Sequence, residues 1–316
     1  MAFLGNQPVN EAQEDLLDSA GLPSDLLAVW SQSEKQTLQH VSDVAARGAA
    51  SLRFSRAERL EAVHWAQVAL GQTRLAEVGV TWLEVLNLLD ACDAAWISRG
   101  AGGRLGDSLE VACWAVVSIL AKHETVFGGT QPLLHRLKVL PELSARVVRD
   151  QQKAFLHVLQ WRTQVPSLEA WIRTFTQRVL VLSTGAFEAQ IHSAQQHAVH
   201  CAQGLLLSSA ACPRHPPRQL ARALVALCLA QTGVVDSHRL SAQDVDDDEW
   251  EDLHLRALNS SASPASASGF EAQLDANVLL AALTCELEQL QQACLLTLGC
   301  LRAIGFIGAP SAMVSI

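Results

Sequence analysis

Two stretches of this sequence would be apolar around nearly their whole circumference as helices, and they restrict the fold more than any other feature. Residues 111–121 and 221–230 are almost unbroken runs of Ala, Val, Leu, Ile, Cys and Trp. A helix of this kind must lie inside a protein or be covered by a partner. Residues 279–301 form a third broadly apolar stretch. We therefore expect several other helices to pack around these segments.

The rest of the sequence also favours helices. The 316 residues include no Tyr, 18 Gly and 10 Pro, and 49% of them are hydrophobic. Sandwiches and barrels of β-strands need more aromatic residues and more Gly and Pro turns. Four residues that can cap a helix are each followed by an acidic residue three positions later. This spacing predicts capping boxes at Ser55, Thr81, Asp107 and Ser241. We predict an all-α fold, either an irregular multi-helix bundle or a degenerate helical solenoid of about ten helices.

A low-complexity stretch divides the predicted helices into two parts. Residues 259–269 are rich in Ser and Ala, a composition typical of linkers. We predict a main helical body over residues 1–258 and, over residues 270–316, a long C-terminal helix with an apolar tail. We expect this last part to pack on the body or on a partner.

Charge is distributed unevenly along the chain, whose net charge is -9. Residues 236–252 contain eight acidic residues and one basic residue, whereas residues 131–180 contain eight basic and three acidic residues. Such asymmetry affects association more than fold. The sequence pI of about 5.6 opposes counterion-driven binding to nucleic acid. We therefore expect the basic stretch to contact an acidic partner or the protein's own acidic segment.

Two segments are the predicted partner-binding sites. The first is an acidic cluster around an aromatic residue that can anchor a partner, and it consists of Asp246, Asp247, Asp248, Glu249, Trp250, Glu251 and Asp252. The second is the apolar tail with Ile304, Phe306 and Ile307, which would be an exposed patch if nothing covered it. An alternative for Trp250 is that it packs its own helix on the body. The other seven Trp, including Trp161, lie in apolar stripes and are expected in the core.

Two groups of residues have the chemistry of metal ligands. The acidic cluster, together with Asp90 and Asp93, has the carboxylates that a divalent cation prefers. Its acids are consecutive, however, so they point all round a helix, which favours a solvated or partner-binding surface. The second group offers the four ligands of a structural Zn²⁺ site, but at a spacing unlike that of standard zinc fingers, and it consists of His197, Cys201, Cys212 and His215. We predict no metal and no other cofactor.

The sequence lacks the common catalytic motifs. It has no Gly-x-Ser-x-Gly, no His-Glu-x-x-His and no phosphate-binding Gly-rich loop after a strand. We therefore predict a non-enzymatic helical adaptor or scaffold subunit that mediates protein–protein interaction within a larger assembly, with no small-molecule substrate. The alternative is an all-α enzyme or small-ligand carrier that uses the Asp-rich metal site.

Cysteine usage and the N-terminal sequence predict the compartment. None of the eight Cys forms a Cys-x-x-Cys motif and most lie in apolar stretches, which is typical of reduced thiols. Residues 1–8 have no basic region and no long apolar region, so we expect no secretory signal peptide. Arg302 interrupts the apolar C-terminal stretch, which opposes a membrane span. We expect a cytoplasmic protein, with the nucleus as the alternative.

Overall fold

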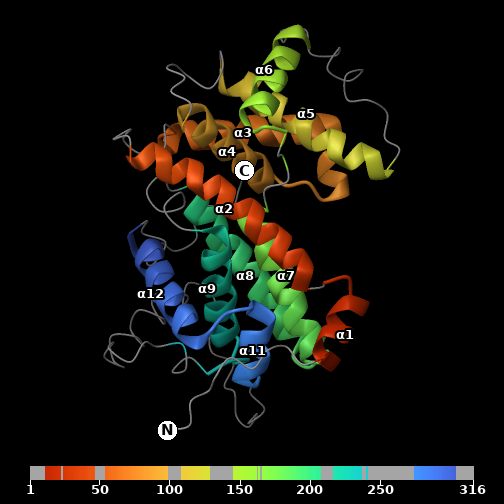
Figure 1. Cartoon of the computed structure of the whole chain (residues 1–316), viewed down its shortest axis with the longest axis vertical. Helices are drawn as coiled ribbons and strands as arrows, with labels where there is room; N and C mark the ends of the chain where they lie inside the picture. Colours follow the sequence, from red (N-terminus) through yellow and green to blue (C-terminus); the bar gives the residue numbers. More distant parts are fainter. Residues whose placement is uncertain are drawn as a thin grey trace. The chain divides into compact units, whose positions relative to one another are not determined.

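The computed structural model describes residues 11–22, 24–46, 54–98, 108–128, 145–161, 163, 166–207, 216–236, 240 and 274–303. These residues form eleven α-helices and one short 3-10 helix, and none of them is in a β-strand (Figure 1). The prediction of an all-α multi-helix bundle is therefore confirmed. The chain divides into two compact units: a middle unit, Trp30–Ser167, and a terminal unit, Met1–Val29 with Leu168–Ile316.

The middle unit is built around one buried helix. Helix α2 (Ser24–Ala46) enters the unit after Val29. The elements that follow are α3 (Arg56–Thr73), η1 (Leu75–Val78), α4 (Trp82–Ser98), α5 (Leu109–Gly128) and α6 (Ala145–Val158). Every side chain over residues 111–119 of α5 is buried, and α3, α4 and α6 pack against this helix. The expectation that this stretch forms a covered helix is confirmed.

The terminal unit is organised in the same way around α9. Its helices are α1 (Glu11–Ser19), α7 (Leu168–Leu182), α8 (Glu188–Leu207), α9 (Pro217–Gln231), α11 (Ala276–Leu283) and α12 (Leu287–Ala303). All side chains over residues 220–230 are buried, because α7, α8 and α12 pack around α9 (Figure 1). Helices α1 and α11 pack on α7.

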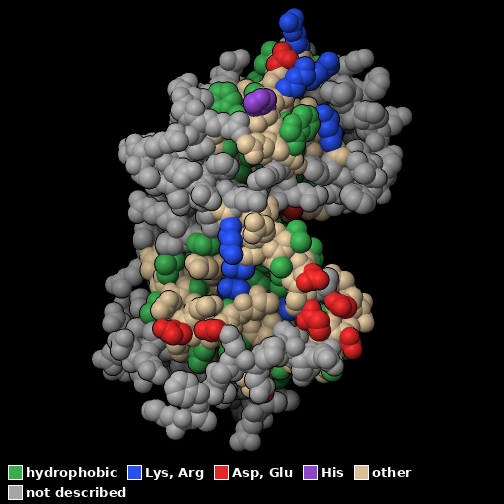
Figure 2. Space-filling model, viewed as in Figure 1, with side chains coloured by type: hydrophobic (Ala, Val, Ile, Leu, Met, Phe, Trp, Pro, Cys, Tyr) green, Lys and Arg blue, Asp and Glu red, His purple; other side chains and the backbone are tan. Residues whose placement is uncertain are grey.

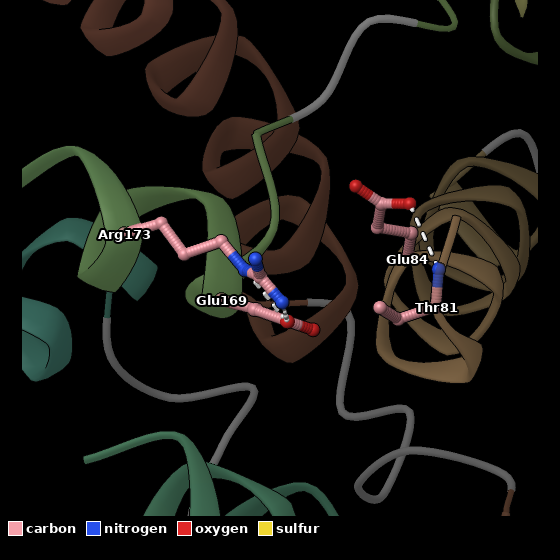
Figure 3. Close-up of polar contacts among 4 residues, drawn as sticks. All are labelled: Thr81, Glu84, Glu169 and Arg173. Atoms are coloured by element: carbon pink, nitrogen blue, oxygen red, sulfur yellow. Dashed lines mark hydrogen bonds and ion pairs between the residues drawn. The ribbon is translucent and has the colours of Figure 1, made fainter. Parts of the chain in front are cut away.

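Capping interactions fix two helix starts where the sequence predicts them. The Ser55 hydroxyl accepts a hydrogen bond from the Glu58 N–H at 3.2 Å, and the Glu58 carboxylate accepts one from the Ser55 N–H at 2.8 Å. This complete capping box begins α3. At α4, the Glu84 carboxylate accepts a hydrogen bond from the Thr81 N–H at 3.2 Å (Figure 3). Each contact satisfies an N–H group that the first turn of a helix leaves without an intrahelical partner.

The other two predicted capping boxes are outside the part of the chain that the structure describes. Asp107 precedes the first described residue of α5, and the Ser108 hydroxyl accepts a hydrogen bond from the Val111 N–H at 3.2 Å. Ser241 also lies outside the described residues.

The C-terminal segment contains two helices where the sequence predicts one long helix. Helix α11 begins at the cap Asp275, whose carboxylate accepts a hydrogen bond from the Asn277 N–H at 2.9 Å. It ends at Thr284, which has a left-handed backbone with φ 53°. Residues 259–269, the predicted linker, lie outside the described residues.

Two buried arginines explain why the chain can end a helix at Thr284. Arg222 of α9 donates hydrogen bonds to the Leu283 carbonyl at 2.7 Å and to both oxygens of Thr284. Arg178 of α7 donates to the Ala282 carbonyl at 3.1 Å. The last carbonyls of a helix lack intrahelical donors and carry a partial negative charge, which a guanidinium satisfies and balances.

Arg178 also connects this helix end to the start of the chain. Its guanidinium donates a hydrogen bond to the Leu22 carbonyl at 2.7 Å, between α1 and α2. Burial lowers the pKa of Arg178, and the negative charge of Glu14 partly offsets this effect. The carboxylate of Glu14 accepts hydrogen bonds from the N–H and the hydroxyl of Ser24, both at 2.9 Å. These polar contacts thus connect α1, the start of α2, α7 and α11 within the terminal unit.

We predict that Arg222→Met lowers the free energy of unfolding by about 3 kcal/mol, because it leaves several buried oxygens without donors. Urea denaturation followed by circular dichroism measures the change. Arg74→Met is the control: Arg74 is 68% exposed and its ion pair with Glu77 is 3.8 Å long, so we expect a change within about 0.5 kcal/mol. Equal losses in the two variants would contradict this account of α11.

Candidate partner-binding surface

Both predicted partner-binding segments lie outside the described residues. This holds for the acidic cluster, residues 246–252, and for the apolar tail with Ile304, Phe306 and Ile307. A candidate surface therefore has to be sought among the described helices.

The candidate zinc ligands are described only in part. His197 and Cys201 lie on α8, whereas Cys212 and His215 lie outside the described residues. Cys201 is buried, and its pKa is lowered because the Cys228 thiol on α9 donates a hydrogen bond to it. Over the described ranges, no three His, Cys, Asp or Glu residues form a group that could hold a metal ion.

The carboxylate of Asp90 forms an ion pair inside the middle unit. Its Oδ1 lies 2.8 Å from an Arg59 nitrogen, and Arg59 is only 1% exposed. Burial raises the pKa of Asp90, and the positive charge of Arg59 partly offsets the rise. Asp93, one turn further along α4, is fully buried. Asp90 thus serves the contact between α3 and α4, and among the described residues it belongs to no group of three candidate metal ligands.

Helix α6 has one side in the core and one side in solvent. Val148, Gln152 and Phe155 are buried, and their spacing of three and four residues places them on one side of the helix. The exposed side is rich in basic residues. We define the basic face as Lys122 of α5 with Arg146, Arg149, Lys153 and the acidic Asp150 of α6, together with two exposed apolar residues, Val147 of α6 and Trp161, which follows the end of α6. Figure 2 shows Lys and Arg side chains gathered over α6.

The positive charge of the basic face is only partly neutralised. Arg146 and Lys153 are 90% and 72% exposed, and both contact the same carboxylate, that of Asp150, at 3.8 and 3.9 Å. One carboxylate cannot balance two cations, and exposed pairs of this length contribute little. The pKa of Lys122 is lowered by partial burial and by the positive charge of Arg149. The packing of α5 on α6 therefore places like charges near one another.

Trp161 is the most exposed large apolar side chain among the described residues, at 74%. The backbone N–H of Trp161 donates a hydrogen bond to the Leu156 carbonyl at 2.8 Å, and the backbone N–H of Gln160 donates one to the His157 carbonyl at 3.2 Å. This pattern is a Schellman motif, in which the residue at the position of Trp161 commonly packs back on the helix. Trp161 instead extends into solvent, so the prediction that it belongs to the core is wrong.

The backbone at this helix end is strained. Gln160 and Trp161 both have left-handed backbone conformations, with φ 54° and 64°. A residue with a side chain pays about 1 kcal/mol or more for this conformation, which glycine adopts freely. Strain of this kind concentrates at functional positions. No sequence signal marked this feature, because neither residue is Gly or Asn and the apolar spacing continues through Trp161.

Comparisons with known proteins identify no relative of this chain. No protein-family model matches the sequence, and neither a curated protein nor a solved structure matches it significantly. Within the described part of the chain, no helix has both the length and the apolar character needed to cross a membrane. The basic face is thus the surface on which the described residues combine unbalanced charge, an exposed aromatic side chain and a strained backbone.

We predict that Arg149→Gln raises the pKa of Lys122 towards its ordinary value, because it removes a nearby positive charge. Titration of the protein with ¹³C-labelled lysine, followed by nuclear magnetic resonance, measures this pKa. Arg74→Gln, a change of the same charge at the residue that follows α3, should leave the pKa of Lys122 unchanged. A Lys122 pKa that does not respond to Arg149→Gln would show that burial alone lowers it.

Proposed function

We propose that this protein is a non-enzymatic helical scaffold subunit that holds a partner protein on the basic face. The observation that carries the proposal is the strained and exposed Trp161 directly after α6, the helix whose exposed side carries Arg146, Arg149 and Lys153. Trp and Arg are the residues most enriched among those that dominate binding energy at protein interfaces. A partner that covers Trp161 would remove its apolar surface from water, which favours binding.

The architecture supports the same proposal. The large apolar helices α5 and α9 are covered within their own units, so neither of them needs a partner to cover it. The polar groups inside it mostly serve structure, as shown by Arg59 with Asp90 and by Arg222 with the end of α11. No described observation favours the alternative of an Asp-rich metal site.

The proposal predicts opposite effects of one substitution on stability and on binding. Asn tolerates the left-handed conformation better than Trp, so Trp161→Asn should leave the free energy of unfolding unchanged or raise it by up to about 1 kcal/mol. The same change should weaken binding of an acidic peptide at least about tenfold, because it removes the aromatic contact. Fluorescence anisotropy of a labelled 16-residue peptide of Glu and Leu measures the binding.

A pair of charge reversals provides the matched control. Arg146→Glu with Lys153→Glu reverses two charges on the basic face, whereas Lys35→Glu with Arg74→Glu reverses two exposed charges elsewhere. The net charge of the protein changes equally in both. We expect only the first pair to weaken binding by about tenfold or more at low salt. Equal effects of the two pairs would mean that the peptide responds to net charge and not to this surface, and the proposal would then be wrong.

A further inference from the structure

The terminal unit carries a surface opposite in charge to the basic face. Asp15 and Asp18 are exposed on α1, and Asp25 is exposed in the first turn of α2. Two large apolar residues beside them are also exposed, Leu16 at 47% and Val29 at 67%. We define these five residues as the acidic face. Figure 2 shows acidic side chains gathered over α1.

The acidic face is held together by the contact between α1 and α2. The Glu14 carboxylate accepts two hydrogen bonds from Ser24 at 2.9 Å, so the start of α2 is fixed against α1. Asp25 and Val29 are four residues apart and therefore lie on the same side of α2. This side faces away from Leu27, which is buried. Asp15 and Asp18 are three residues apart and therefore lie on the same side of α1, so the acidic face consists of this side of α1 and of the adjoining start of α2.

The exposed apolar residues of the described chain concentrate on these two faces. The large hydrophobic side chains that are exposed are Leu16, Val29, Leu60, Val147, Trp161 and Leu296. Two of them belong to the acidic face and two to the basic face. Each face therefore combines a single sign of net charge with two apolar side chains, which is the composition of a polar rim around a small apolar contact.

We propose that the acidic face of one copy of this chain binds the basic face of a second copy. This inference rests on the proposed function, since it names the partner of the same surface. The basic face has four cations and one carboxylate and the acidic face has three carboxylates, so the net charges are opposite and equal. Each face also offers the other two apolar side chains to cover. Because the two faces are different surfaces, the contact is head-to-tail and leaves one face of each kind free.

The net charge of the whole protein opposes nucleic acid and anionic membranes as partners of the basic face. A chain with net charge -9 is repelled at long range by nucleic acid and by anionic membranes. A second copy is repelled by the same net charge, but its acidic face presents both carboxylates and exposed apolar residues to the basic face. Binding through such surfaces weakens as salt screens the charges.

Two charge-reversal variants test this arrangement. Asp15→Lys with Asp18→Lys reverses the acidic face, and Arg146→Glu with Lys153→Glu reverses the basic face. All four side chains are exposed, so we expect the variants to fold, and circular dichroism and thermal unfolding check this. Sedimentation velocity then measures the mass of the wild type, of each variant and of their equimolar mixture, at up to about 200 µM protein and about 50 mM salt.

The head-to-tail contact predicts a specific pattern. The mass of the wild type should rise with concentration, and the association should weaken about tenfold when salt is raised to about 0.3 M. Each variant alone should associate at least about tenfold more weakly, because the changed face of one copy then repels the unchanged face of the next copy. The mixture should form a one-to-one complex with the affinity of the wild type, because the intact basic face of one variant meets the intact acidic face of the other.

Three results would overturn the inference: a wild type that stays monomeric at all concentrations, variants that associate as the wild type does, or a mixture that does not associate. If the wild type is monomeric while the acidic peptide still binds in a manner that depends on Trp161, the proposed function stands and the second copy is not the partner. If nucleic acid or anionic vesicles bind the basic face more tightly than the second copy does, the inference is also wrong.

Discussion

The need to cover two helices that have almost no polar side determines the rest of this structure. Helices α5 and α9 expose no side chain over residues 111–119 and 220–230. A helix in this position removes its whole apolar surface from water only if neighbours surround it. In the middle unit α3, α4 and α6 do so, and in the terminal unit α7, α8 and α12 do. Some of the neighbouring helices, such as α6, have an outer side that remains exposed and carries charge. The basic face of α6 is such an outer side.

Much of this fold could be predicted from the sequence. The broad apolar runs predicted the covered helices, and the spacing of Ser55 and Glu58 predicted the start of α3, because both signals are local and are read within a few residues. The end of α11 could not be predicted in this way. It depends on Arg178 and Arg222, which are about 60 to 100 residues away in sequence from the carbonyls that they contact. An Arg within an apolar helix looks the same in the sequence whether it reaches a carbonyl or solvent.

The candidate surface, too, could be predicted from the sequence only in part. The excess of basic residues over residues 131–180 indicated a contact with an acidic partner or with the protein's own acidic segment, and the structure places three of these residues on the outer side of α6. Trp161 was assigned to the core because helical spacing continued up to it. The helix ends before Trp161 through a Schellman motif built without Gly, and Trp161 lies in solvent after this end. Apolar spacing that continues past a helix end contains no information on where the helix stops.

The choice of arginine to hold the end of α11 has a consequence for acid tolerance. A carboxylate or an imidazole in this place would gain or lose its charge within the range in which proteins function, whereas a guanidinium remains protonated throughout. Although burial lowers the pKa of Arg178, an acidic medium only favours its charged form. Acidification should therefore first loosen contacts that depend on carboxylates, such as the ion pair of Arg59 with Asp90, whose pKa is raised by burial, and leave the contacts of Arg178 and Arg222 with the end of α11 intact.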